Sequence, residues 1–235
     1  MGPFKTLISL LVLVTLSALA SPASMASTQA STSGQLLVLL RDASALAIVD
    51  PESRAVVGRV PTGRDPHEVT ASADGRYAFV TSMVDGISVI DLTARTEIRR
   101  INPGPGSRPH DVLFVDGKVY FTIEGYKSIG RYDVAADEID WTIGIGQEGT
   151  HMLVLNPDTN TMFMPNTGSN TVTMIEGVMT GPAASRLTVI PIPGELPEGI
   201  DLSPNGQELW TATRNDGGVS IIDVASRRVV ETIDL

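Results

Sequence analysis

The stretch that decides the fold is Pro66–Pro103, PHEVTASADGRYAFVTSMVDGISVIDLTARTEIRRINP. Apolar and polar residues alternate in four short runs within it: 67–72, 77–83, 86–92 and 97–102. Alternation with a period of two between turn residues is typical of β-strands. Asp74-Gly75 lies between the first two runs and favours a tight hairpin, because glycine accepts a positive φ and aspartate bonds its own backbone. The stretch therefore predicts a four-stranded antiparallel meander.

The same pattern recurs along the chain from residue 35 onward. The first run is repeated around His67, His110, His151 and Glu198, at spacings of 43, 41 and 47 residues. The second run occurs five times: at 37–40, 78–81, 120–123, 162–165 and 209–212. A four-strand unit of about 40–45 residues is the sequence sign of a β-propeller blade, which cannot bury both faces alone. We expect an all-β protein, a β-propeller of four-stranded antiparallel blades with about five blades present.

Two pairs of runs carry a resemblance to a known family: Ala78–Ser82 with Ile87–Asp91, and Leu209–Thr213 with Val219–Asp223. They resemble the YVTN-type β-propeller repeats of surface-layer and other exported proteins, and the resemblance covers roughly residues 35–235. It implies a ring of about seven blades. It implies little about activity, since propellers of this kind host binding proteins, lactonases, lyases and metal enzymes.

The count of strands is uneven, with five second, third and fourth strands but four first strands. Residues 35–40, 45–50 and 55–60 match the second, third and fourth strands, and no first strand precedes them. Residues 229–235 match a fourth strand, so nothing completes the ring. We therefore expect an open arc of a seven-blade ring, truncated at the C-terminus. A five-blade ring closed in another way is the alternative.

The first 26 residues have the features of an export signal. Lys5 supplies a positive start, Leu7–Ala20 is an uncharged apolar run, and Pro22 ends it. About fourteen apolar residues are short for a membrane-spanning helix, which needs about twenty. We expect cleavage after Ala26 or Ala20, a polar linker over 27–34, and a propeller domain over 35–235. The mature protein is then secreted, periplasmic or at the cell surface, with no membrane span.

Composition narrows the classes of partner and cofactor. The net charge is −10, and residues 1–26 contribute one Lys and no acid, so the rest of the chain is still more acidic. Such a surface repels phosphate backbones and makes nucleic acid a poor partner. The chain has no Cys, which excludes disulfides, thiolate metal sites and covalent c-type haem.

All three histidines fall at one position of the repeat. His67, His110 and His151 share it with Glu198, and the innermost strand of a propeller lines the central channel. Imidazoles and a carboxylate that converge at one channel mouth predict a possible site for a divalent metal, the one cofactor the sequence points to. The alternative is structural: a repeated His that bonds the backbone of the neighbouring blade.

The loops between second and third strands lie on the same face as the starts of the first strands, since an even number of chain reversals separates them. Glu124, Asn166 and Arg214 follow directly on their strands and predict a ring of contacts for a small polar ligand. The repeated acids at 50, 91, 133, 176 and 223 instead precede short turns. There a carboxylate accepts backbone N–H bonds, so we expect these acids to be structural.

Two classes of function remain. The favoured one is an extracytoplasmic ligand-binding or protein-interaction scaffold, which acts through the channel mouth and loop face and has no catalytic residue. The absence of a nucleophile elbow, a zinc-protease helix and a phosphate-binding loop supports it. The alternative is a lactonase-like hydrolase or lyase that uses a metal, or His67, His110 and Glu198 as acid–base groups.

Overall fold

A computed structural model describes residues 34–235, and in this part of the chain five antiparallel sheets follow one another in sequence order. We call them blades 1 to 5. Their strands are, for blade 1, β1 (Leu36–Leu40), β2 (Ala45–Val49) and β3 (Val56–Pro61); for blade 2, β4 (Pro66–Ala71), β5 (Tyr77–Ser82), β6 (Gly86–Asp91) and β7 (Thr96–Ile101); for blade 3, β8 (Pro109–Val115), β9 (Lys118–Ile123), β10 (Ser128–Asp133) and β11 (Glu138–Gly144); for blade 4, β12 (Val154–Asn156), β13 (Thr161–Asn166), β14 (Thr171–Glu176) and β15 (Arg186–Pro191); for blade 5, β16 (Pro197–Leu202), β17 (Glu208–Thr213), β18 (Gly218–Asp223) and β19 (Arg228–Asp234).

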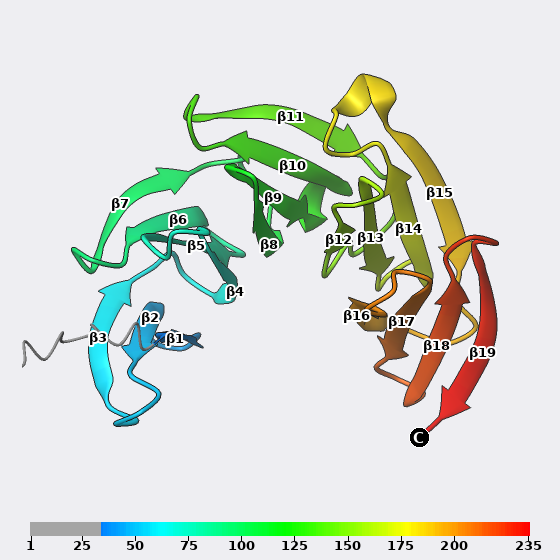
Figure 1. The fold of residues 1–235 in the computed structure, drawn as a ribbon, viewed down its shortest axis with the longest axis horizontal. Coiled ribbons are helices and arrows are strands. Elements are labelled where there is room, and N and C mark those ends of the chain that lie inside the picture. The colour runs from blue at the N-terminus through cyan, green and yellow to red at the C-terminus, as the bar shows by residue number, and fades with distance from the viewer. Residues whose placement is uncertain (1–33) are drawn as a thin grey trace, which may run out of the picture. The chain divides into compact units, whose positions relative to one another are not determined.

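The expected all-β propeller architecture is confirmed. Blades 2 to 5 have four strands each, and blade 1 has three, since between residue 34 and β1 the structure has no further strand. In the described residues the only helical elements are two 3₁₀ turns, η1 (Glu124–Tyr126) and η2 (Pro182–Ala184). The inner strands face the inside of an arc of blades and the outer strands its rim, with blades 1 and 5 at its two ends (Figure 1). No helix in residues 34–235 has the length and apolar character needed to cross a bilayer.

The turns form as their residues predict. Gly75 has φ +69° and its N–H bonds the carbonyl of Ser72, which closes the β4–β5 hairpin. Four of the five repeated acids accept N–H bonds from the residues two or three positions on, as expected for structural turns: Asp50, Asp91, Asp133 and Asp223. Glu176 departs from this pattern and pairs with Arg227 instead.

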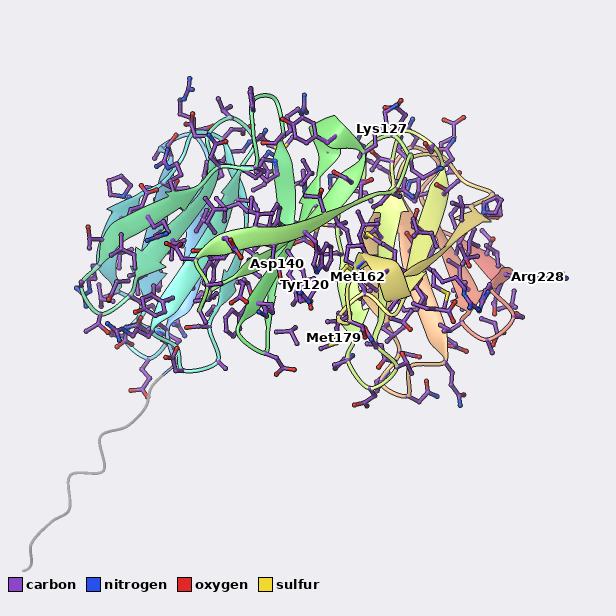
Figure 2. The ribbon with its side chains drawn as sticks, turned by 90° about the horizontal axis from the view of Figure 1, so that it is seen from above. Tyr120, Lys127, Asp140, Met162, Met179 and Arg228 are labelled. Carbon is purple, nitrogen blue, oxygen red and sulfur yellow. The ribbon has the colours of Figure 1, made fainter. Side chains whose placement is uncertain are left out.

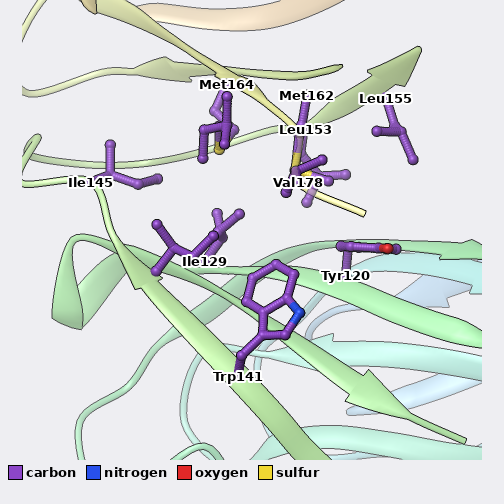
Figure 3. Close-up of a cluster of buried hydrophobic side chains, with 11 residues drawn as sticks. Tyr120, Ile129, Trp141, Ile145, Leu153, Leu155, Met162, Met164 and Val178 are labelled. Carbon is purple, nitrogen blue, oxygen red and sulfur yellow. The ribbon is translucent and has the colours of Figure 1, made fainter. Parts of the chain in front are cut away.

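The core lies between blades rather than within them. Phe79 and Phe121 pack between blades 2 and 3, and Tyr120, Trp141 and Met162 pack between blades 3 and 4. Figure 2 shows Tyr120 and Met162 in the interior, and Figure 3 shows Trp141 among the aliphatic side chains of this cluster. The sequence predicts Trp141 and Trp210 as inter-blade core, because both fall in expected strands, and this packing confirms it for Trp141.

The same expectation for Trp210 is wrong. Trp210 lies on β17 with 39% of its surface exposed, because within the described chain no further blade covers that face of blade 5. Leu209 and Thr211, which point to the opposite face of the same strand, are buried against blade 4 or within the blade.

Candidate functional site

The inner strands begin with a β-bulge that sets one side chain apart from the strand ladder. In blade 2 the register shifts within Pro66–Val69, so that His67 and Glu68 together face Thr81. Equivalent shifts occur in blades 3 and 5, at Pro109–Val112 and Pro197–Gly199. A bulge bends the strand and re-aims its side chains. The repeat position of the histidines is therefore a position at which side chains leave the sheet.

The residue two positions before each histidine and before Glu198 has a left-handed backbone. These residues are Asp65 (φ +56°), Arg108 (φ +51°), Gly149 (φ +66°) and Leu196 (φ +54°). The carbonyl oxygen of each accepts a backbone hydrogen bond from the residue that follows β5, β9, β13 or β17. The donors are Met83 at 3.1 Å, Glu124 at 3.2 Å, Thr167 at 2.9 Å and Arg214 at 3.0 Å. In each of these blades the loop after the second strand is thus held beside the bulge.

Threonines on the second strands fix the bulges across neighbouring blades. Thr122 Oγ1 accepts the N–H of Asp111 at 2.9 Å within blade 3 and donates to the carbonyl of His151 in blade 4 at 2.8 Å. Thr81 makes the equivalent pair of bonds, to the N–H of Glu68 and the carbonyl of His110. Each histidine after the first is therefore held by the blade before it.

The structure brings all three histidines and Glu198 together. The ring centroids of His67 and His110 are 4.5 Å apart, and those of His110 and His151 are 3.7 Å apart. His151 Nε2 lies 3.4 Å from Glu198 Oε1, and the same oxygen lies 3.3 Å from an Nη of Arg214. At the other end His67 Nε2 lies 3.5 Å from Asp65 Oδ2. The result is a continuous polar row across the inner edges of the blades.

These side chains line a polar cavity of about 510 Å³, which we call the mouth cavity. Such a volume lies within the range of small-molecule sites. Its lining residues are Arg41, Asp65, His67, Glu68, Met83, Arg108, His110, Glu124, His151, Thr167, Glu198 and Arg214. The cavity thus combines the predicted channel position with the loops that the sequence placed on the same face.

Burial keeps the central imidazoles neutral. It lowers the pKa of His110 to about 3, and the neighbouring His151 and His67 lower it further. Burial also lowers the pKa of His151, against the opposing charges of Glu198 and Glu124. The Nδ1 atoms of His110 and His151 are buried and have no hydrogen-bond partner within the described chain. A neutral imidazole offers one donor and one acceptor. Because both Nδ1 atoms are buried, the contacts of these rings with the cavity come from their other atoms.

Two buried acids stand beside the histidines. Burial raises the pKa of Glu68, and it raises the pKa of Asp111 to about 7 although the backbone N–H groups of Leu153 and Val112 both bond the carboxylate. The bond from Leu153 N, 2.6 Å long, joins blade 4 to blade 3. Asp111 thus links blades 3 and 4 through its carboxylate. Burial removes water from this group and so makes its charged form less favourable.

Of the predicted ligand contacts, Glu124 and Arg214 line the mouth cavity and Asn166 does not. Asn166 is fully buried, and its side-chain amide bonds Thr150, Thr171 and Thr173. The structure thus places Asn166 away from the mouth cavity, among the threonines of blade 4. Thr167, the next residue along, takes the place at the cavity.

The predicted metal site remains a prediction. His67, His110, His151 and Glu198 are neighbours, but within residues 34–235 no three His, Asp or Glu side chains are arranged to hold a metal ion. The imidazoles instead pack against one another, with tilted rings at interplanar angles of 55° and 38°.

The sequence reading missed Asp65, Glu68 and Arg108 at the cavity. Asp65 and Arg108 share one repeat position, two residues before a histidine, and that regularity was the available signal. The sequence pattern does not predict the left-handed backbone at Asp65 and Arg108, which turns both side chains toward the mouth cavity.

Comparison with known families matches residues 32–135 to the cytochrome D1 heme domain. The match covers fewer than half of the residues, and it supports the propeller fold because that family is a β-propeller family. The YVTN-type and surface-layer resemblance is not part of this finding.

Solved structures with the same fold are diverse. Hydrazine synthase of Kuenenia stuttgartiensis matches with a TM-score of 0.72 and 19% identity, over 86% of this chain and 63% of that one. A functionally unknown protein from Desulfotomaculum acetoxidans matches with a TM-score of 0.71 and 16% identity, over 86% of this chain and 67% of that one. U3-55K matches with a TM-score of 0.69 and 15% identity, over 84% of this chain and 63% of that one. The chain spans about two thirds of the length of these proteins, and at such identities the likeness shows the fold alone.

Proposed function

We propose that this chain is an exported β-propeller that binds a small polar ligand in the mouth cavity. The observation that carries the proposal is the mouth cavity of about 510 Å³, which is lined by polar side chains from all five blades. A concave site in which a few polar groups converge is typical of small-molecule binding, because those groups fix the orientation of the ligand.

The name of the matched family suggests haem as a ligand, but the lining of the mouth cavity does not fit haem. A histidine nitrogen is a common axial ligand of haem iron. However, the three imidazoles stack on one another, and ten of the twelve lining residues are charged or histidine, the others being Met83 and Thr167. A porphyrin presents two broad apolar faces, for which this cavity has no apolar walls. The lining suits a small molecule with hydrogen-bonding groups.

The location of the ligand is tested by blocking the cavity. Thr167→Trp places a large side chain at the mouth, and Thr159→Trp makes the same change on an exposed turn between β12 and β13. Thermal-shift screening of sugars, amino acids and organic acids is expected to give compounds that stabilise the wild type and Thr159→Trp but not Thr167→Trp. Compounds that stabilise Thr167→Trp equally would contradict the proposed site.

Metal analysis separates this proposal from the lactonase-like hydrolase. A ligand-binding propeller is expected to purify without a stoichiometric transition metal. An ion present in the wild type at one per chain and lost in His110→Ala would favour the enzyme instead.

Export is the part of the proposal that rests on sequence alone, since residues 1–26 lie outside the described residues. The N-terminal mass of the protein recovered from the periplasm or medium is expected to begin at Ser21 or Ser27. Recovery of an intact N-terminus from the cytoplasm would contradict export.

A further inference from the structure

Three arginines at the mouth cavity each use a single nitrogen in a side-chain bond. Arg108 and Arg214 each make a single side-chain bond, at 3.3 Å, to Glu124 and Glu198. Arg41 bonds Asp65 through Nε alone. A guanidinium has five N–H donors in a fixed fork, so most donors of these three arginines remain unused within the described chain.

Three arginines outside the cavity use the fork more fully. Arg64 bonds Asp85 through Nε at 2.9 Å and Nη at 2.8 Å. Arg100 and Arg131 make equivalent two-point contacts with Glu97 and Asp140. Two-point pairing is the stronger arrangement for a guanidinium and a carboxylate. Arg76 and Arg99 also make single contacts, but they lie outside the mouth cavity. The cavity arginines differ in that three of them share one space with donors left over.

The three arginines approach the cavity from alternate blades. Arg41 follows β1, Arg108 precedes β8 and Arg214 follows β17, and all three line the same space. Their side chains are 62%, 55% and 59% exposed, so the guanidinium groups can reorient toward an incoming molecule. Donors that converge from three blades suit a ligand with more than one acceptor group.

The charge of the lining decides which ligand gains from this arrangement. Asp65, Glu124 and Glu198 each already have an arginine partner, so each pair is close to neutral. Glu68, the fourth acid of the lining, has no such partner, and burial raises its pKa toward the neutral form. A ligand with one negative charge gains little there, because it competes with a carboxylate for the same guanidinium. A ligand with two or three anionic groups engages several guanidinium groups at once, and the effective concentration of its second group is high.

We propose that the mouth cavity binds a small organic polyanion with two or three carboxylate or phosphate groups, and that Arg41, Arg108 and Arg214 are its charge-assisted donors. This inference rests on the proposed function of the same cavity and names the class of its ligand. The neutral imidazoles of His110 and His151 supply further hydrogen bonds to the uncharged part of the ligand.

Calorimetric titration with citrate, succinate, propionate and glucose tests the inference. We expect citrate to bind more tightly than succinate, and propionate and glucose to give no measurable heat at millimolar concentration. The double variant Arg214→Gln/Glu198→Gln keeps the net charge of the mouth unchanged and removes one guanidinium. It is expected to weaken citrate binding about tenfold.

The matched control is Arg64→Gln/Asp85→Asn, which removes an ion pair on the same face but outside the cavity lining. It is expected to leave citrate affinity unchanged, and thermal melting checks that each variant is folded. Equal affinities in the two double variants would overturn the inference, as would citrate binding that persists in Thr167→Trp.

The outcomes separate the inference from the proposed function. Binding of glucose, with no heat from citrate or succinate, and its loss in Thr167→Trp would overturn the polyanion and retain the cavity as a ligand site. Absence of heat from citrate and succinate alone overturns the inference. If any of these probes binds Thr167→Trp as tightly as it binds the wild type, both the polyanion inference and the proposed ligand site are contradicted.

Discussion

Two adjacent residues at the mouth, His110 and Asp111, have pKa values that are shifted toward the neutral form. Burial is the main cause for both, and it lowers the pKa of His110 to about 3 and raises that of Asp111 to about 7. Their effects on stability have opposite signs. Between pH 6.5 and 3, His110 is protonated in the unfolded chain and neutral in the folded chain, so lowering the pH reduces the stability of the fold. Between pH 7 and 3.8, Asp111 is protonated in the folded chain and charged in the unfolded chain, so lowering the pH increases that stability.

The first prediction follows from these signs. His110→Gln should lose less stability between pH 7 and 5 than the wild type, and Asp111→Asn should lose more. Each proton changes the slope by at most about 1.4 kcal/mol per pH unit. Urea unfolding at several pH values measures the slopes. Wild-type slopes in both variants would show that neither group titrates as its burial requires.

A second prediction concerns the core between blades 2 and 3. Phe121 is fully buried in the inter-blade cluster, so Phe121→Ala should cost about 3–5 kcal/mol of unfolding free energy. His151→Ala removes a side chain that lines a cavity and should cost much less. Denaturant unfolding compares the two, and equal losses would identify the histidine as a structural residue rather than a ligand contact.

Single residues also show where sequence reasoning stops. Asn166 and Glu124 both follow directly on a second strand, yet Asn166 is buried among threonines and Glu124 lines the cavity. The alternation pattern gives the strand on which a residue lies. It does not give the hydrogen-bond partners, which come from other strands, and these partners decide whether a polar side chain turns inward or toward a ligand.

At the scale of elements, the period-2 runs predicted the strands to within one or two residues. The run 77–83 became β5 (Tyr77–Ser82), and 86–92 became β6 (Gly86–Asp91). The bulges that begin the inner strands were not predicted, because a bulge is a shift in pairing between two strands rather than a property of either. Those bulges create the site, so the fold was more predictable than its function.

The third prediction tests the element that holds a bulge. Thr122→Val keeps the shape of the side chain but leaves the N–H of Asp111 and the carbonyl of His151 without their bonds. Each buried unsatisfied group costs about 1–3 kcal/mol, so the variant should be clearly destabilised. Thr122→Ser retains the hydroxyl and should behave nearly as the wild type in the same unfolding measurement. Similar stabilities for the two variants would remove the hydroxyl from the inter-blade contact.

At the scale of the whole domain, the two end blades each have one neighbour within residues 34–235. β1 pairs with β2 alone, which leaves one edge of that strand without a partner, and Trp210 and Val230 are exposed on blade 5. In a repeat array, each interface contributes a nearest-neighbour stabilisation, so an uncovered end loses both energy and cooperativity. Unpaired strand edges also invite pairing with a second chain.

The last prediction is that this 235-residue chain, expressed alone, associates through its ends instead of forming a closed monomeric ring. Light scattering coupled to size-exclusion chromatography should give a mass above that of one chain. Trp210→Lys should raise the monomer fraction, because it places a charge on the uncovered face of blade 5 where a second chain would dock. Val84→Lys makes the same change at an exposed residue of the β5–β6 loop and should not. A sharp, cooperative melt of a strictly monomeric chain would refute this prediction, and it would favour a five-blade ring closed by contacts that the arc of blades 1 to 5 does not contain.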